Sequence, residues 1–210
     1  MIDQGVRQIA ILADDFWNPG GQNGLRLLND MTEWLKEVKK EYPDMKMTIP
    51  YVPYDYMGNG SSQELQILKQ APDNVQIVMT GGRVWGEVTD NFTSTFTNNV
   101  GRGPFMWINW PCTDNSKKHL IMGGYDTFLH PGVEPSKIQG IMLNPMQQSE
   151  PSKVAIFGNA SYAWNIWETK EEAEEIWNAS FSFVDHNSAI SNEASDALRD
   201  CLLYTSDAAD

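Results

Sequence analysis

Cysteine and histidine are scarce in this chain of 210 residues, which contains 2 Cys and 3 His. Two cysteines provide neither a disulfide framework nor a CxxC metal motif, and isolated histidines predict no protein-ligated metal and no cofactor. Basic residues are also few, because 15 Lys and Arg stand against 28 Asp and Glu, for a formal net charge of -13. That balance argues against nucleic-acid binding. No apolar run reaches transmembrane length, so the sequence predicts no membrane insertion, and no signal peptide is visible.

Aromatic residues, in contrast, are plentiful, with 8 Trp and 7 Tyr in a chain that is 41% hydrophobic. This content is ample for a buried core, and the length suits one domain of ordinary size. Aromatic faces also suit sugar rings, although the core is the commoner place for any single one of them.

Apolar segments typical of strands alternate with amphipathic segments typical of helices along the first 166 residues. The pattern predicts strands at residues 6–13, 45–52, 75–79, 104–108 and 138–143. It predicts helices at residues 25–42, 61–71, 89–99 and 152–164, with Ser61 or Ser62 as N-cap of the second and Glu64 in its first turn. The first segment ends in the apolar run of residues 9–13 and is interpreted as a strand buried on both faces. The order of the segments indicates an α/β protein with a parallel sheet.

Polar residues follow each predicted strand, and they are Asp14-Asp15, Asp55-Tyr56, Thr80, Asn109 and Asn144. Functional residues at the carboxyl ends of strands are typical of a (β/α) barrel, and an open doubly wound sheet would also fit. Asp14 and Asp15 are the most informative of these residues. Two adjacent acids reach one site only where a strand loses its regularity, and there one can be ionised while the other is protonated.

The chain changes character after the predicted barrel segment, which covers residues 1–166. An acidic stretch at residues 168–175 begins a helix, so residues 167–200 are interpreted as the start of a helical region. Residues 201–210 resemble the in-frame translation of a transposase-type sequencing adapter, which predicts a partial reading frame and leaves Cys112 as the one native thiol. This tail is excluded from reasoning about the fold.

Three motifs in series resemble glycoside hydrolase family 84, the β-N-acetylglucosaminidases that include O-GlcNAcases and bacterial hyaluronidase-type enzymes. They are Asp14-Asp15 after the first strand, W-I-N-W-P-C-T-D at residues 107–114, and N-P-M at residues 144–146 followed by Ser152-Lys153. The resemblance covers roughly residues 5 to 185. It implies a (β/α)8 barrel, of which this chain would hold roughly five of the eight units, and a substrate of β-linked N-acetylglucosamine in glycans or glycoproteins.

The same resemblance implies a retaining mechanism in which the 2-acetamido oxygen of the substrate attacks the anomeric carbon and forms an oxazoline. Asp14 would accept the acetamido N–H hydrogen bond, and Asp15 would be the general acid and later the general base. Tyr56 would hydrogen-bond the oxygen that forms the oxazoline. Asn109 would brace the acetamido group, and Trp107 would line the pocket around its methyl group.

Asp114 and Asn144 would hold sugar hydroxyls that are remote from the scissile bond, and Thr80 would lie near the pocket. The chain departs from the family in one respect, because a glycine and a lysine of the early strands have no counterpart in it. An incomplete barrel exposes strand edges, so this segment alone is predicted to be unstable and inactive. The location of the whole protein stays open, with secretion or the cell surface as candidates.

Two alternatives come from other classes of protein. A receiver domain that accepts phosphate also has an acid pair, a later Asp and a Thr at strand ends, which Asp14, Asp15, Asp55 and Thr80 imitate. It requires in addition a lysine after its last strand, which is absent at residues 107–111. A non-catalytic glycan-binding relative is the second alternative, although both acids are present here.

Overall fold

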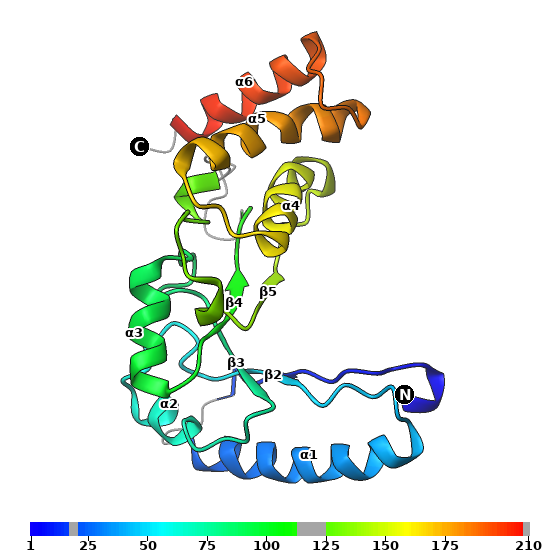
Figure 1. Ribbon diagram of the computed structural model, residues 1–210, viewed down its shortest axis with the longest axis vertical. Coiled ribbons are helices and arrows are strands. Elements are labelled where there is room, and N and C mark those ends of the chain that lie inside the picture. The colour runs from blue at the N-terminus through cyan, green and yellow to red at the C-terminus, as the bar shows by residue number, and fades with distance from the viewer. Residues whose placement is uncertain (17–20, 113–124, 208–210) are drawn as a thin grey trace. The chain divides into compact units, whose positions relative to one another are not determined.

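A computed structural model gives the structure of the protein and describes residues 1–16, 21–112 and 125–207 (Figure 1). Contacts divide the chain into two compact units, each assembled from segments distant in sequence. The first unit comprises Met1–Arg83, Asn91–Met106 and Ser136–Gln139. The second comprises Val84–Asp90, Trp107–Pro135 and Gly140–Asp210.

Five strands form a sheet whose spatial order follows the sequence, β1-β2-β3-β4-β5. They are β1 (Ile11–Leu12), β2 (Ile49–Val52), β3 (Val75–Met79), β4 (Phe105–Ile108) and β5 (Gly140–Leu143). The pairs β1–β2, β2–β3 and β3–β4 are parallel. The amide of Gln139 donates to the carbonyl oxygen of Pro104, and the amide of Asn144 donates to that of Ile108. Residue numbers increase in the same direction along both strands, so β4 and β5 are parallel as well. The predicted α/β class with a parallel sheet is confirmed.

The strand order also decides between the alternatives that the sequence left open. A doubly wound sheet reverses its order at a switch point, and in the receiver type the first strand lies between the second and third. The sequential order of this sheet has neither feature. The doubly wound and receiver interpretations are therefore wrong for this chain.

Helices of the first unit follow the strands as predicted (Figure 1). They are α1 (Gln22–Glu41), α2 (Gln63–Leu68) and α3 (Asp90–Val100), and a 3₁₀ helix, η1 (Ile2–Gln4), precedes them. Leu28 and Leu35 of α1 are fully buried, as the helical spacing indicated. Ser62 is the N-cap of α2, and its hydroxyl accepts a hydrogen bond of 3.4 Å from the amide of Leu65. The two rings of α3 that supported its assignment, Phe92 and Phe96, stack with centroids 6.0 Å apart.

The second unit contains α4 (Ser149–Trp164), α5 (Lys170–His186) and α6 (Glu193–Asp207), with the 3₁₀ helix η2 (Tyr125–Thr127), while η3 (Pro135–Lys137) lies at the division between the units. Helices α5 and α6 run side by side (Figure 1). Tyr125 is the centre of an aromatic core, with ring centroids 5.6 Å from Trp110, 5.3 Å from Trp167 and 4.9 Å from Trp177. These three tryptophans are buried, so they serve the core.

Within the part of the chain that the structure describes, no helix is both long and apolar enough to cross a membrane.

The first strand differs from its prediction. A strand over residues 6–13, buried on both faces, is wrong, because β1 comprises only Ile11 and Leu12 and Leu12 is 62% exposed. The reason is its place in the sheet, since β1 is an edge strand with β2 as its one neighbour among the described residues. The second strand is also shorter than predicted and begins at Ile49.

Close packing in the second unit gives a test of its core. A methyl group at Gly158 would come within 2.3 Å of the Tyr125 ring. Alanine is the better helix former by about 1 kcal/mol. We nevertheless expect Gly158→Ala to lower the free energy of unfolding, because overpacking a buried ring costs about 1–3 kcal/mol. Denaturant unfolding measures the change, with Ala160→Gly on the exposed face of the same helix as a control for helix propensity. A variant more stable than wild type would contradict the packing described here.

Candidate functional site

The two acids lie in a turn at the carboxyl end of β1. The amide of Ala13 makes the last ladder bond, 2.9 Å to the carbonyl oxygen of Val52. The amide of Phe16 then donates to the carbonyl oxygen of Ala13 over 3.0 Å, which closes a turn with Asp14 and Asp15 at its centre. Asp14 is half-buried and Asp15 is exposed. The strand has thus lost its alternation where the acids occur, as the sequence predicted.

Tyr56 is a neighbour of both acids. It follows β2 and is half-buried. Burial raises the pKa of its phenol, and the negative charges of Asp14 and Asp15 raise it further. Leu12 pairs with Val52 in the β1–β2 ladder, so the residues that follow the two strands enter the same edge of the sheet, and the effect of both acids on the Tyr56 phenol agrees with that placement.

Thr80 supports the loop that carries Tyr56. Its amide donates a hydrogen bond of 3.0 Å to the carbonyl oxygen of Tyr56. Its hydroxyl oxygen lies 2.6 Å from the carbonyl oxygen of Arg83 and 3.2 Å from that of Tyr56, so the one hydroxyl proton has backbone acceptors on both sides. The side chain is fully buried. Direct contact between Thr80 and a sugar stays a prediction.

Glu64, in the first turn of α2, is a residue whose part in this region the sequence did not indicate. It is 5% exposed, and its two carboxylate oxygens accept hydrogen bonds from the amides of Tyr54 and Asp55. A glutamate at the start of a helix is an ordinary stabilising residue. Only the tertiary structure shows that it reaches the loop after β2.

The amides at the ends of β4 and β5 form a second group, in the second unit. The side chain of Asn144 donates a hydrogen bond of 2.9 Å to Asn109 Oδ1. Asn109 in turn donates 2.8 Å to the carbonyl oxygen of Val84. Asn109 is 7% exposed, and Asn144 is exposed. Trp107, two residues before Asn109, is half-buried. The structure thus links two residues predicted to bind the sugar through one hydrogen bond.

The predicted site residues are therefore found in two groups, one in each unit. Asp14, Asp15, Tyr56 and Thr80 belong to the first unit, and Trp107, Asn109 and Asn144 belong to the second. Asp114 lies outside the described residues.

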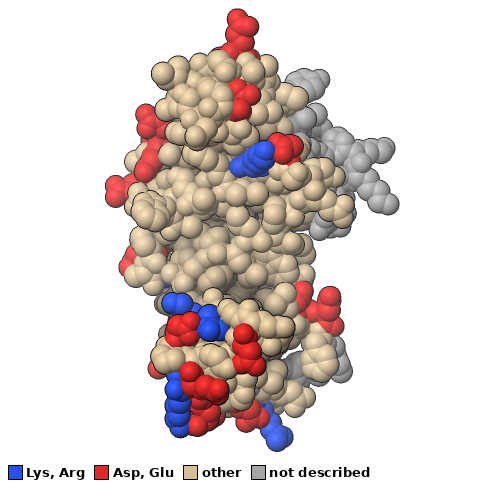
Figure 2. Space-filling model, turned by 90° about the vertical axis from the view of Figure 1, so that its right-hand side faces the viewer, with Lys and Arg blue, Asp and Glu red and all other residues tan. Residues whose placement is uncertain are grey.

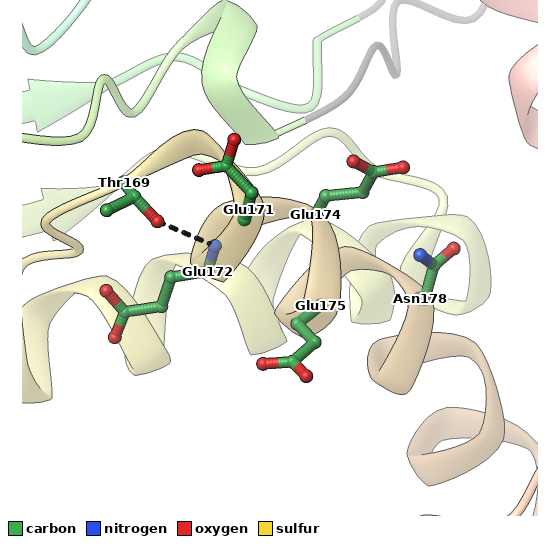
Figure 3. Close-up of a pocket in the computed structure, with 6 residues that line it drawn as sticks. All are labelled: Thr169, Glu171, Glu172, Glu174, Glu175 and Asn178. Carbon is green, nitrogen blue, oxygen red and sulfur yellow. Dashed lines mark hydrogen bonds between the residues drawn. The ribbon is translucent and has the colours of Figure 1, made fainter.

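A surface depression over the start of α5 is lined by acids and is separate in sequence from the predicted site residues (Figure 3). Its lining residues are Thr169, Glu171, Glu172, Glu174, Glu175 and Asn178. Thr169 is the N-cap, and its hydroxyl accepts a hydrogen bond of 3.2 Å from the amide of Glu172. Negative side chains are favourable at a helix amino terminus, so stabilisation of α5 accounts for them.

Elsewhere on the surface, positively and negatively charged side chains lie close to one another. On the face drawn in Figure 2, the described Lys and Arg side chains lie beside Asp and Glu side chains. The pairs Lys36–Glu33 and Lys40–Glu37 on α1, each 2.7 Å long, are of this kind. Among the described residues, no group of three or more His, Cys, Asp or Glu side chains has a geometry suited to a metal ion.

Comparison with known proteins places these features in a family. The profile of the NAGidase family, described as beta-N-acetylglucosaminidase, matches residues 1–202. Among solved structures, the chain is similar to that of CpGH84D, with 30% identity and a TM-score of 0.74 over 94% of this chain and 31% of that one. CpGH84B shares the fold at 24% identity and a TM-score of 0.71, over 94% and 34% of the two chains. A mutant O-GlcNAc hydrolase of Thermobaculum terrenum does so at 22% identity and a TM-score of 0.67, over 89% and 42%.

A parallel α/β sheet with acids and amides at its strand ends, together with these matches, defines a protein of the glycoside hydrolase class. The chain belongs to the β-N-acetylglucosaminidases of glycoside hydrolase family 84. It spans between 31% and 42% of the length of the three structures compared.

The ionisation of Tyr56 tests the arrangement of the first group. Both acids raise the pKa of its phenol, so we expect Asp14→Asn to lower that pKa toward the ordinary value, because one repelling charge is lost. Titration of ¹³C-labelled tyrosine by NMR measures the shift. Tyr51 serves as the internal control, since burial and Glu64 raise its pKa to about 12. An unchanged Tyr56 pKa in both Asp14→Asn and Asp15→Asn would show that the three residues are not neighbours.

Proposed function

We propose that this chain is part of the catalytic domain of a retaining β-N-acetylglucosaminidase that acts by substrate-assisted catalysis. The observation that carries the proposal is the cluster of Asp14, Asp15 and Tyr56 at the carboxyl ends of β1 and β2. Such a reaction needs one carboxylate to orient the substrate, one carboxylic acid to transfer a proton, and a donor for the developing oxazoline. The cluster supplies these three groups.

The two acids have separate roles in this mechanism. Asp14, which is half-buried, accepts the N–H hydrogen bond of the 2-acetamido group and stabilises the positive charge that develops as its oxygen attacks the anomeric carbon. Asp15, which is exposed, protonates the leaving oxygen and then removes a proton from the water that opens the oxazoline. The first step forms the bond from the acetamido oxygen to C1 and breaks the glycosidic bond. In the second step the water oxygen forms a bond to C1 and the bond from C1 to the acetamido oxygen breaks, so two inversions leave the configuration at C1 unchanged.

The other site residues bind the terminal sugar. Tyr56 donates a hydrogen bond from its phenol to the acetamido oxygen, and burial together with the two acids raises the pKa of that phenol, so it stays a donor. Asn109 and Asn144, joined by a hydrogen bond of 2.9 Å, act together, with Asn109 toward the acetamido group and Asn144 toward a hydroxyl. Trp107 lines the pocket, Asp114 binds a further hydroxyl, and Thr80 lies beside the pocket and supports Tyr56.

The substrate class that this proposal implies is terminal β-linked N-acetylglucosamine in a glycan or glycoprotein. We also propose that the sheet is part of the wall of a (β/α)8 barrel, with roughly five of its eight units in this chain. The sequential strand order and the exposed side chain of Leu12 on edge strand β1 support this. Residues 1–166 would then belong to the barrel and residues 167–200 to a helical region that follows it.

Hydrolysis of an aryl β-N-acetylglucosaminide by the full-length gene product tests the roles of the acids. We expect Asp14→Ala to lower kcat by about 10²–10⁴-fold, the usual contribution of such a group. Asp15→Ala should slow the first step less, because an activated leaving group needs little protonation. A wild-type enzyme that binds N-acetylglucosamine but does not cleave the substrate would indicate the non-catalytic relative instead.

The barrel proposal is tested by comparing this chain alone with the full-length protein. Edge strand β1 leaves Leu12 62% exposed, and an open parallel sheet lacks covering elements. We therefore expect residues 1–200 alone to unfold at lower denaturant concentration than the full-length protein and to show no hydrolysis of the aryl substrate. Activity of the isolated segment at the full-length rate would refute the barrel proposal.

A further inference from the structure

Glu64 is a buried acid whose hydrogen bonds leave its own helix. Its Oε1 accepts a bond of 3.1 Å from the amide of Tyr54, and its Oε2 accepts a bond of 2.8 Å from the amide of Asp55. The side chain is 5% exposed. Burying a carboxylate is costly unless it is well hydrogen-bonded. Burial accordingly raises the pKa of Glu64, and the two amide bonds offset part of that rise.

Those two amides belong to the loop that carries Tyr56. The loop leaves β2 after Val52 and turns at Asp55, whose carbonyl oxygen accepts a bond of 3.2 Å from the amide of Gly58. The carbonyl oxygen of Tyr56 is held by the amide of Thr80 over 3.0 Å. Glu64 therefore fixes the backbone immediately before Tyr56, and Thr80 fixes the backbone at Tyr56 itself.

Glu64 also meets the chain that follows the two acids. Gly21, at the start of α1, has a left-handed φ of +71°, and a methyl group there would lie 3.0 Å from the Glu64 carbonyl oxygen and 3.2 Å from its Cγ. Glycine at this position thus allows α1 to begin directly against Glu64. One residue contacts both the end of the β1–α1 connection and the loop of Tyr56.

We propose that Glu64 is a positioning residue that holds the hydroxyl of Tyr56 beside Asp14 and Asp15 through the β2–α2 loop. The inference rests on the proposed function, since it concerns the hydrogen bond from the Tyr56 hydroxyl to the acetamido oxygen. A carboxylate suits this position because it accepts from two successive amides at once. A glutamine would accept from one and oppose the other with its own N–H groups.

The alternative is that Glu64 only stabilises α2 through its place in the first turn of the helix. That role requires no contact with Tyr54 or Asp55, whereas both carboxylate oxygens are used on those amides. The two roles also differ in what a variant would change, because a helix-stabilising residue alters stability and a positioning residue alters the chemistry of Tyr56.

Glu64→Gln in the full-length protein, assayed on an aryl β-N-acetylglucosaminide, tests the inference. We expect kcat to fall by about 10–100-fold while KM changes by less than about 3-fold, as for an interaction used mainly in the transition state. Leu68→Val is the control, because Leu68 is a fully buried apolar residue of the same helix, while the two loop amides bond to Glu64. It should lower stability and leave kcat within about 2-fold of wild type at a temperature where both are folded.

A double-mutant cycle with Tyr56→Phe separates positioning from general damage. If Glu64 acts through the Tyr56 hydroxyl, the double variant should be at most about 3-fold slower than Tyr56→Phe alone. Multiplicative losses, or an unchanged kcat in Glu64→Gln, would overturn the inference. An inactive wild type would instead count against the proposed function. If Glu64→Gln does not fold, Glu64→Asp keeps the charge but withdraws the carboxylate from the two amides by one methylene, and the same cycle with Tyr56→Phe decides.

Discussion

Parallel pairing between neighbouring strands is the constraint on which the candidate site depends. In the β1–β2 ladder Leu12 pairs with Val52, so both strands end at one level and their following residues enter the same edge of the sheet. A slip of one residue would turn each side chain to the opposite face. The same rule operates in the second unit, where the amide of Asn144 bonds to Ile108 and brings its side chain to Asn109.

The sequence predicted the interior of the sheet better than its edge. Strand β3 has the predicted bounds, Val75–Met79, and Val75 and Ile77 are fully buried. A continuous apolar run indicates that a segment is to be covered, but not by which elements. The segment that contains β1 is also apolar, but β1 lies at the edge of the sheet and has one neighbouring strand among the described residues. Only Ile11 and Leu12 pair with that neighbour, β2. Periodicity carries no information about neighbours, and this limited the prediction.

For the candidate site, the sequence indicated which residues take part but not which residues they bond to. Acids and amides at strand ends could be predicted, because strand ends are where an α/β fold exposes chemistry. Their partners could not, since the bond between Asn109 and Asn144 joins residues far apart in the sequence. Glu64 is the clearest case, because its local context indicates helix stabilisation while its burial and its bonds to Tyr54 and Asp55 are tertiary.

The charge of the first group also bears on the proposed chemistry. The transition state of glycoside hydrolysis resembles an oxocarbenium cation, and preorganised negative groups stabilise positive charge as it develops. Asp14 places such charge beside Tyr56, and Asp15 adds to it as it gives its proton to the leaving oxygen. Burial and the charges of the same acids raise the pKa of the Tyr56 phenol, so the acids that favour a cation do not weaken its role as a hydrogen-bond donor. One arrangement of charge therefore serves both the sugar ring and the acetamido oxygen.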